Sequence, residues 1–247
     1  MNARLILACL IALPPLHAAE KKKPKDGEPP PPPAHLLFVN AVEDRGLAFV
    51  VLDGQDVQRR GFRNGQVTGW LGVASGARQV RVEHEPLGIV EKESDLAPGS
   101  HHALIAHNHS QPQPETGRPP RPAIGVLWVD CDEAARGRAG DDKVPLTVIN
   151  ATSQPEIMLK TGALKLKARR LQPVKARVSA EGSFLSLTLE REEEKKDPPS
   201  DDSQEPQEAS PLASVNIEEK AAFFVVLIEK TPGEIAAATF SLALPAP

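Results

Sequence analysis

Histidines gathered between residues 101 and 109 are the side chains of this sequence best suited to holding a metal ion. Alternate residues of a β-strand share a face, so His107 and His109 would place two imidazoles side by side, and imidazole nitrogens bind both zinc and copper. A metal site needs a third ligand, which His101 or His102 would supply only if the strand bends. The favoured alternative is a polar strand end that needs no cofactor.

A run of positive charge suggests a second kind of chemistry, the binding of an anion. Residues 157–180 contain no acid, and the stretch Leu164 to Ala168 alternates leucine with lysine, which predicts a sheet face with bases outward and leucines toward the core. Such a face could contact the carboxylates of a uronic-acid polymer or an acidic partner protein. A solvated face without a ligand is the alternative. The six candidate binding residues are Lys165, Lys167, Arg169, Arg170, Lys175 and Arg177.

A smaller basic group has the same two interpretations, and it comprises Arg59, Arg60 and Arg63.

Motifs for catalysis are missing from the sequence. The segment Gly72-Val73-Ala74-Ser75-Gly76 has the wrong spacing for a nucleophile elbow, and there is no phosphate-binding loop, dinucleotide fingerprint or Cys-x-x-Cys pair. Cys131 follows a predicted strand, where a small buried thiol is expected. We therefore predict that the protein is not an enzyme.

The first residues have the charged, apolar and small-residue regions of a secretory signal peptide: Arg4, the apolar run 5–13, and Ala18-Ala19. Cleavage near residue 19 would release the chain into the periplasm or beyond, and the apolar run is too short to remain as a transmembrane segment. The mature chain would keep one cysteine and form no intramolecular disulfide. An exported acidic protein, with a formal net charge of −4 and few aromatic residues, is a poor candidate for binding nucleic acid.

The elements that would position these residues repeat along the chain. Phe38-Val39-Asn40-Ala41 recurs as Val148-Ile149-Asn150-Ala151, an offset of 110 residues. After each copy comes an extended segment that ends in a glycine turn, then an alternating strand, and then an apolar strand. This period is too long for a solenoid unit and indicates two tandem domains.

Short apolar or alternating runs between turn signals predict an all-β fold of two tandem antiparallel β-sandwich domains. Glu133 to Arg138 is the only helix candidate. Residues 191–214, rich in charge, proline and serine, cannot repay their ordering entropy, so they are predicted to be a disordered acidic hairpin insertion in the second domain. The predicted boundaries are a signal peptide at 1–19, a proline-rich linker at 20–33, domain one at 34–132, a linker at 133–142 and domain two at 143–244.

Short motifs in both halves carry a family resemblance. Val39-Asn40-Ala41, the turn Gly72 to Gly76 and the approach Ala97 to Leu104 resemble secreted β-sandwich repeats of unassigned function. The two-domain layout, with Val148-Ile149-Asn150-Ala151 opening the second half, resembles the periplasmic accessory proteins of alginate O-acetylation over about residues 35–244. The sequence departs from that family at His101-His102, where an aromatic pair is usual, and in its acidic insertion.

The resemblance implies a non-catalytic adaptor that works with a polysaccharide O-acetyltransferase in the cell envelope, together with an anionic, alginate-like polysaccharide. Two alternatives remain open. One is a general secreted β-sandwich binding or structural module with no link to acetylation. The other is a small metal-binding envelope protein that uses His107 and His109.

Overall fold

The computed structural model describes residues 29–43, 46–113, 119–135, 143–179, 184–189, 212–216 and 221–243. The predicted signal peptide and residues 191–211 of the predicted acidic insertion lie outside this part of the chain. The insertion was predicted to reach residue 214, but strand β14 already begins at Ala213. Within the described residues, no helix is long and apolar enough to cross a membrane.

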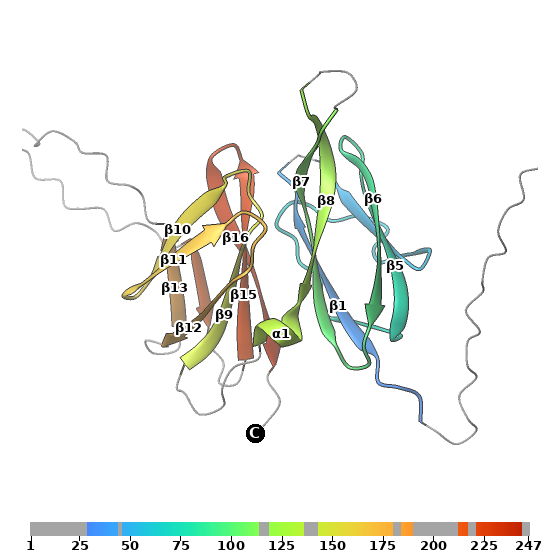
Figure 1. The fold of residues 1–247 in the computed structure, drawn as a ribbon, viewed down its shortest axis with the longest axis horizontal. Helices are drawn as coiled ribbons and strands as arrows, with labels where there is room; N and C mark the ends of the chain where they lie inside the picture. The colour runs from blue at the N-terminus through green and yellow to red at the C-terminus, as the bar shows by residue number, and fades with distance from the viewer. Residues whose placement is uncertain are drawn as a thin grey trace, which may run out of the picture. The chain divides into compact units, whose positions relative to one another are not determined.

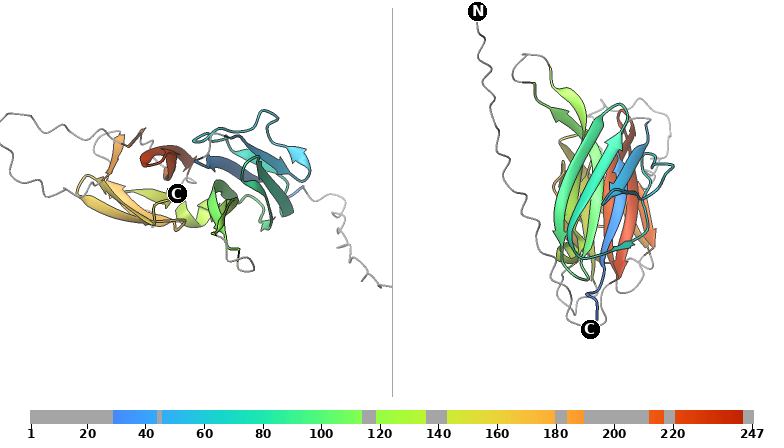
Figure 2. Two further views of the ribbon diagram at one scale, coloured as in Figure 1. Left: turned by 90° about the horizontal axis from the view of Figure 1, so that it is seen from above. Right: turned by 90° about the vertical axis from the view of Figure 1, so that its right-hand side faces the viewer.

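Domain 1 is a sandwich of two four-stranded sheets, ordered β4-β1-β7-β8 and β3-β2-β5-β6 (Figure 1). Apolar residues from both sheets, including Phe38, Phe62 and Leu104, form the core between them. The long β7–β8 hairpin, drawn in green, extends beyond its neighbours (Figure 2). The strands are β1 (Ala34–Ala41), β2 (Ala48–Leu52), β3 (Gln55–Asp56), β4 (Leu71–Val73), β5 (Gly76–His84), β6 (Gly88–Leu96), β7 (His101–Gln111) and β8 (Arg121–Asp130).

Domain 2 has the same architecture, with sheets ordered β12-β9-β15-β16 and β11-β10-β13-β14. Its core includes Leu146, Leu159 and Phe223. Each strand occupies the same place as the domain 1 strand whose number is lower by eight, as β9 does to β1. The strands are β9 (Lys143–Asn150), β10 (Glu156–Thr161), β11 (Leu164–Arg169), β12 (Val174–Ser179), β13 (Phe184–Leu189), β14 (Ala213–Asn216), β15 (Ala221–Thr231) and β16 (Glu234–Ala243).

The predicted all-β pair of sandwiches is therefore confirmed, but the sheets are not antiparallel throughout. β1 pairs with β7 in parallel, and β9 pairs with β15 in parallel. Parallel neighbours need a long connection, and each of these pairs is connected through the other sheet of its sandwich. The short helix α1 (Cys131–Ala135) begins earlier than the predicted helix, because the Asp130 side chain caps it by accepting a hydrogen bond from the Glu133 backbone N–H at 2.9 Å.

A third apolar core joins the two domains. It contains Val39 of β1 and Ile105 of β7 together with Ile149 of β9 and Phe224 of β15, and α1 contributes Cys131. Strands β1 and β15 are therefore buried on both faces, which explains why each contains a continuous apolar run, Leu36–Val39 and Ala221–Ile228, rather than alternating residues. The inner sheets pack on each other, so each domain exposes only its outer sheet, its edges and its loops.

The repeated asparagines, Asn40 and Asn150, are wholly buried and perform the same task in each domain. The Asn40 side chain donates to the Phe62 carbonyl at 2.8 Å and accepts from the Val42 backbone N–H at 3.0 Å. The Asn150 side chain donates to the Ala168 carbonyl at 3.2 Å and accepts from the Thr152 N–H. The Asn-Ala motif thus closes a turn and ties it to an edge strand.

Candidate functional site

Three of the predicted anion-binding residues share one surface on the outer sheet of domain 2. Lys165, Lys167 and Arg169 of β11 are exposed, whereas Leu166 and Ala168 between them are buried. The predicted alternation is therefore correct in the body of the strand. Leu164 is the exception, with 39% of its surface exposed, because it lies at the start of the strand beside the turn.

The neighbouring strand β10 extends this surface. Lys160 lies directly opposite Lys165 in the antiparallel register and is also exposed. Like charges directly opposite one another on a sheet repel. Glu156, further along β10, places one carboxylate oxygen 2.6 Å from the Lys167 Nζ and the other 3.9 Å from the Arg169 Nε. We call Lys160, Lys165, Lys167 and Arg169 the basic face.

The other three predicted bases lie elsewhere. The Arg170 guanidinium turns toward domain 1, where it donates to the Asn108 carbonyl at 2.6 Å, and it also donates to the Thr152 carbonyl at 2.9 Å. Lys175 and Arg177 belong to β12, in the other sheet of the sandwich. Lys175 forms an ion pair with Glu133 of α1 at 3.0 Å. The six bases therefore do not form one surface.

His107 and His109 do lie side by side, with ring centroids 6.4 Å apart. His107 is buried, and its Nδ1 donates a hydrogen bond to the Asn108 carbonyl at 3.0 Å. Burial lowers the pKa of His107 below its ordinary value, and the nearby charge of Arg170 acts in the same direction. Among the described residues, no three histidine, cysteine or acidic side chains come together in a way that could hold a metal ion.

His101 and His102 lie at the opposite end of β7 and have other partners. The His101 Nδ1 is 3.0 Å from an Asp132 carboxylate oxygen, and its ring stacks on His35. The His102 Nε2 is 3.0 Å from the Ser100 hydroxyl. β7 pairs with β8 in an unbroken register from residue 102 to residue 111, so no bend brings these rings toward His109.

Cys131 is wholly buried in the core between the domains, as expected for a structural thiol. Its Sγ lies 3.8 Å from the Val129 carbonyl. Burial raises the pKa of the Cys131 thiol to about 12. At neutral pH the group stays protonated, and it has little nucleophilic character.

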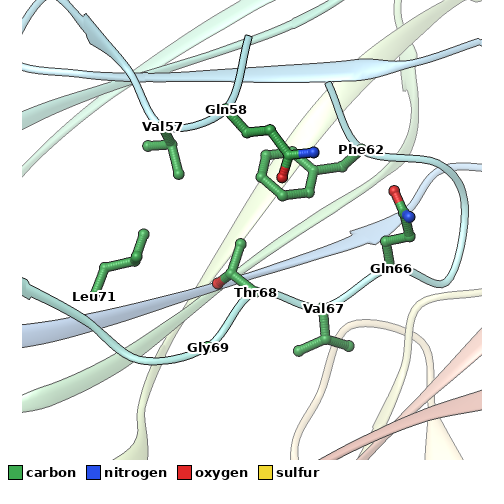
Figure 3. A pocket seen from close by; sticks show the side chains of 8 residues that line it. All are labelled: Val57, Gln58, Phe62, Gln66, Val67, Thr68, Gly69 and Leu71. Atoms are coloured by element: carbon green, nitrogen blue, oxygen red, sulfur yellow. The ribbon is translucent and has the colours of Figure 1, made fainter. Parts of the chain in front are cut away.

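A groove opens at the edge of domain 1, along the segment that connects the edge strands β3 and β4 (Figure 3). Its volume is about 390 Å³. Gln58 and Phe62 lie on one side of it, and Thr68 and Leu71 point into it from the other (Figure 3). The lining combines side-chain amides and a hydroxyl with apolar walls, and consists of Val57, Gln58, Phe62, Gln66, Val67, Thr68, Gly69 and Leu71.

The loop that forms the groove is fixed by the repeated asparagine. The Asn40 backbone N–H donates to the Gln66 carbonyl at 3.0 Å, and its carbonyl accepts from the Gly65 N–H at 2.7 Å. The Thr68 hydroxyl accepts from the Phe38 N–H at 2.8 Å. Sequence reasoning recognised the repeat of Asn40 but missed the groove that it supports. The sequence signal was a longer stretch of chain between Asn40 and its partner Phe62 than between Asn150 and its partner Ala168.

Arg59, Arg60 and Arg63 belong to this same loop and are exposed. Their guanidinium groups make no hydrogen bond or ion pair to any residue that the structure describes. Exposed bases that the sequence singled out thus lie on both domains, on the basic face of domain 2 and on this loop of domain 1. Comparison of the sequence with protein-family models and with curated proteins gives no match.

Proposed function

We propose that this protein is a non-catalytic adaptor of the cell envelope, which binds an anionic polysaccharide through the basic face of domain 2. A membrane-bound or periplasmic O-acetyltransferase is its proposed partner. The observation that carries the polysaccharide part is the opposition of Lys160 and Lys165 across β10 and β11, with Lys167 beside them. A carboxylate placed between two opposed lysines gains charge-assisted hydrogen bonds from both.

The shape of this surface suits an extended polymer. The basic residues follow the strand at alternate positions and lie on the outward side of a sheet whose other side is buried. A polymer that carries a carboxylate on each unit can engage several of them together, so modest individual contacts add up. Binding of this kind weakens as salt screens the charges.

The acetylation partner is proposed from the family resemblance, and the envelope location from the signal-peptide pattern of residues 1–19. Burial raises the pKa of the Cys131 thiol, which argues against this thiol as a nucleophile. The shared apolar core between the inner sheets also favours a second candidate, a structural or binding module with no link to acetylation, because this core packs the two domains into one unit.

The binding experiment compares retention of the protein on immobilised alginate and on a neutral glucan. The variant K160Q/K165Q/K167Q should lose at least about tenfold in affinity for alginate, whereas the control K92Q, which removes an exposed lysine from β6 of domain 1, should not. Equal retention of the triple variant and the wild type would contradict the polysaccharide part of the proposal.

The adaptor part needs a separate experiment. Deleting the gene should lower the O-acetyl content of the envelope polysaccharide, and the tagged protein should co-purify with an acetyltransferase. Unchanged acetylation in the deletion strain would leave the module without a link to acetylation as the better description.

A further inference from the structure

The segment that forms the groove of domain 1 differs from the equivalent segment of domain 2, although the two domains share one strand order. In domain 2, β10 and β11 pair without interruption from Thr161–Leu164 to Ile157–Ala168. In domain 1, β2 pairs with β3 only at Leu52–Gln55 and Val51–Asp56, and the next bridge joins Ala48 to Phe62. The Val57 N–H still donates to the Val50 carbonyl at 2.9 Å, so residues 58–61 bulge out of the edge strand beside the groove.

This bulge has a defined conformation. Gly61 has a positive φ of 67°, and a Cβ at this position would lie 3.0 Å from a ring carbon of Phe49. Only glycine fits this turn without strain. On the far side of the loop, Asn64 donates to the Val42 carbonyl at 2.6 Å and to the Glu229 carbonyl of domain 2 at 3.1 Å. The groove is thus held in place at both ends of its loop.

The lining of the groove is uncharged, and the positive charge of its loop comes from arginines next to the lining residues. From residue 57 to residue 74 the sequence contains three arginines and no acid. Arg59 and Arg60 follow the lining residue Gln58, and Arg63 follows the lining residue Phe62. Guanidinium groups pair with carboxylates in a bidentate manner, and the side-chain amide of Gln58 can both donate to and accept from a hydroxyl.

We propose that this groove binds a single acidic sugar residue, such as a uronic acid. Its volume of about 390 Å³ is at the lower end for small-molecule sites, which fits one or two sugar rings better than a folded partner. In this complex the arginines bind the carboxylate of the sugar, the side-chain amides of Gln58 and Gln66 hydrogen-bond to its hydroxyls, and the apolar walls contact its ring. This site lies on domain 1, separate from the basic face of domain 2, and does not depend on it.

The test uses a uronic acid tetrasaccharide, its carboxyl-reduced counterpart and an acidic hexapeptide as probes, with calorimetry and amide NMR on the full exported chain. We expect the tetrasaccharide to shift the amides of Gln58, Phe62 and Thr68, and R59Q/R60Q to weaken its binding about tenfold or more. The control R121Q removes an exposed arginine from β8 and should bind as the wild type does. Thermal unfolding of each variant checks that the fold is intact.

Four results would overturn this site: no tetrasaccharide binding, equal binding of the reduced sugar, tighter binding of the peptide, or an unchanged affinity in R59Q/R60Q. The variant K160Q/K165Q/K167Q separates this inference from the proposed function. If it still holds long alginate while R59Q/R60Q loses the tetrasaccharide, the basic face is the wrong polymer site and the groove stands. The reverse pattern removes the groove and keeps the basic face.

Discussion

Asn64 of domain 1 and Arg170 of domain 2 occupy equivalent positions and bond across the domain interface in the same way. Asn64 donates to the Val42 carbonyl of its own domain and to the Glu229 carbonyl of domain 2. Arg170 donates to the Thr152 carbonyl of its own domain and to the Asn108 carbonyl of domain 1.

The residue after each of them confirms the equivalence. Gly65 and Leu171 both have a positive φ, and their N–H groups donate to the Asn40 and Asn150 carbonyls respectively. The two acceptors across the interface, Asn108 and Glu229, are equivalent too. Each lies two positions after the residue that pairs with the repeated asparagine, which is Ala106 for Asn40 and Leu227 for Asn150. The interface is therefore approximately two-fold symmetric, as in an isologous dimer.

Removing Arg170 should loosen this interface. In R170A the Thr152 and Asn108 carbonyls lose a charged donor, so we expect the free energy of unfolding to fall by about 2–3 kcal/mol. Urea unfolding measures it. The exposed neighbour provides the control, because R169A should change stability by less than about 0.5 kcal/mol. Equal effects of the two variants would mean that the cross-domain bonds contribute nothing.

Gly125 should not tolerate alanine. A Cβ there would lie 2.5 Å from the His107 ring, which is opposite Gly125 in the β7–β8 register. Overpacking of this kind costs about 1–3 kcal/mol. The corresponding pair in domain 2 is Ile228 and Ala236, so the double variant H107I/G125A copies a combination that the fold already accepts.

The prediction for this pair is a coupling measured by a double-mutant cycle. H107I/G125A should be more stable than G125A alone, since the alanine no longer meets the imidazole. If the two substitutions are simply additive, the contact between His107 and Gly125 is not what restricts the site.

The sequence predicted the strands well because their signals are local. The alternating strand predicted in the second repeat is Phe184–Leu189, and the apolar strand predicted to follow it is Ala221–Thr231. The sequence could not predict which strands pair with one another. Parallel neighbours such as β1 and β7 are distant in sequence, and nothing in either run specifies direction.

The candidate sites were predictable only in part, for the same reason. Alternation placed Lys165 and Lys167 on an outer face, because period two is a property of one strand. Arg170 belongs to the same run of bases, but its position just after the strand turns it into the domain interface. The groove depends on a bulge between β3 and β4, which is recognisable only against the uninterrupted pairing in domain 2.

Cys131 should resist thiol reagents in the folded protein. Its side chain is wholly buried and its pKa is raised to about 12 by burial, so the reactive thiolate is scarce at neutral pH. Reaction of the chain without residues 1–19, which omits Cys9, with a maleimide or a disulfide reagent should be slow in buffer and rapid in denaturant. Fast labelling in buffer would mean that the core between the domains opens readily, contrary to the packing around α1.

Glu229 should make stability depend on acid pH. Burial alone would raise the pKa of its carboxyl, but hydrogen bonds from the Gly233 N–H at 2.8 Å and from the Ser153 hydroxyl and N–H, with the nearby charge of Arg170, hold it below its ordinary value of 4.5. The unfolded chain therefore binds this proton at a higher pH than the folded chain does. The stabilisation is complete well above pH 4.5 and is lost as the pH falls through the folded pKa.

The variant E229Q removes this titration. At neutral pH we expect it to be less stable than the wild type by about 1–3 kcal/mol, because the amide replaces a charged acceptor. As the pH falls below 4.5 the difference should shrink, since the wild type alone must now protonate Glu229. Urea unfolding of both proteins from neutral to acid pH measures it, with E91Q on the exposed side of β6 as the control. A difference that stays constant over this range would show that Glu229 acts through packing rather than through its charge.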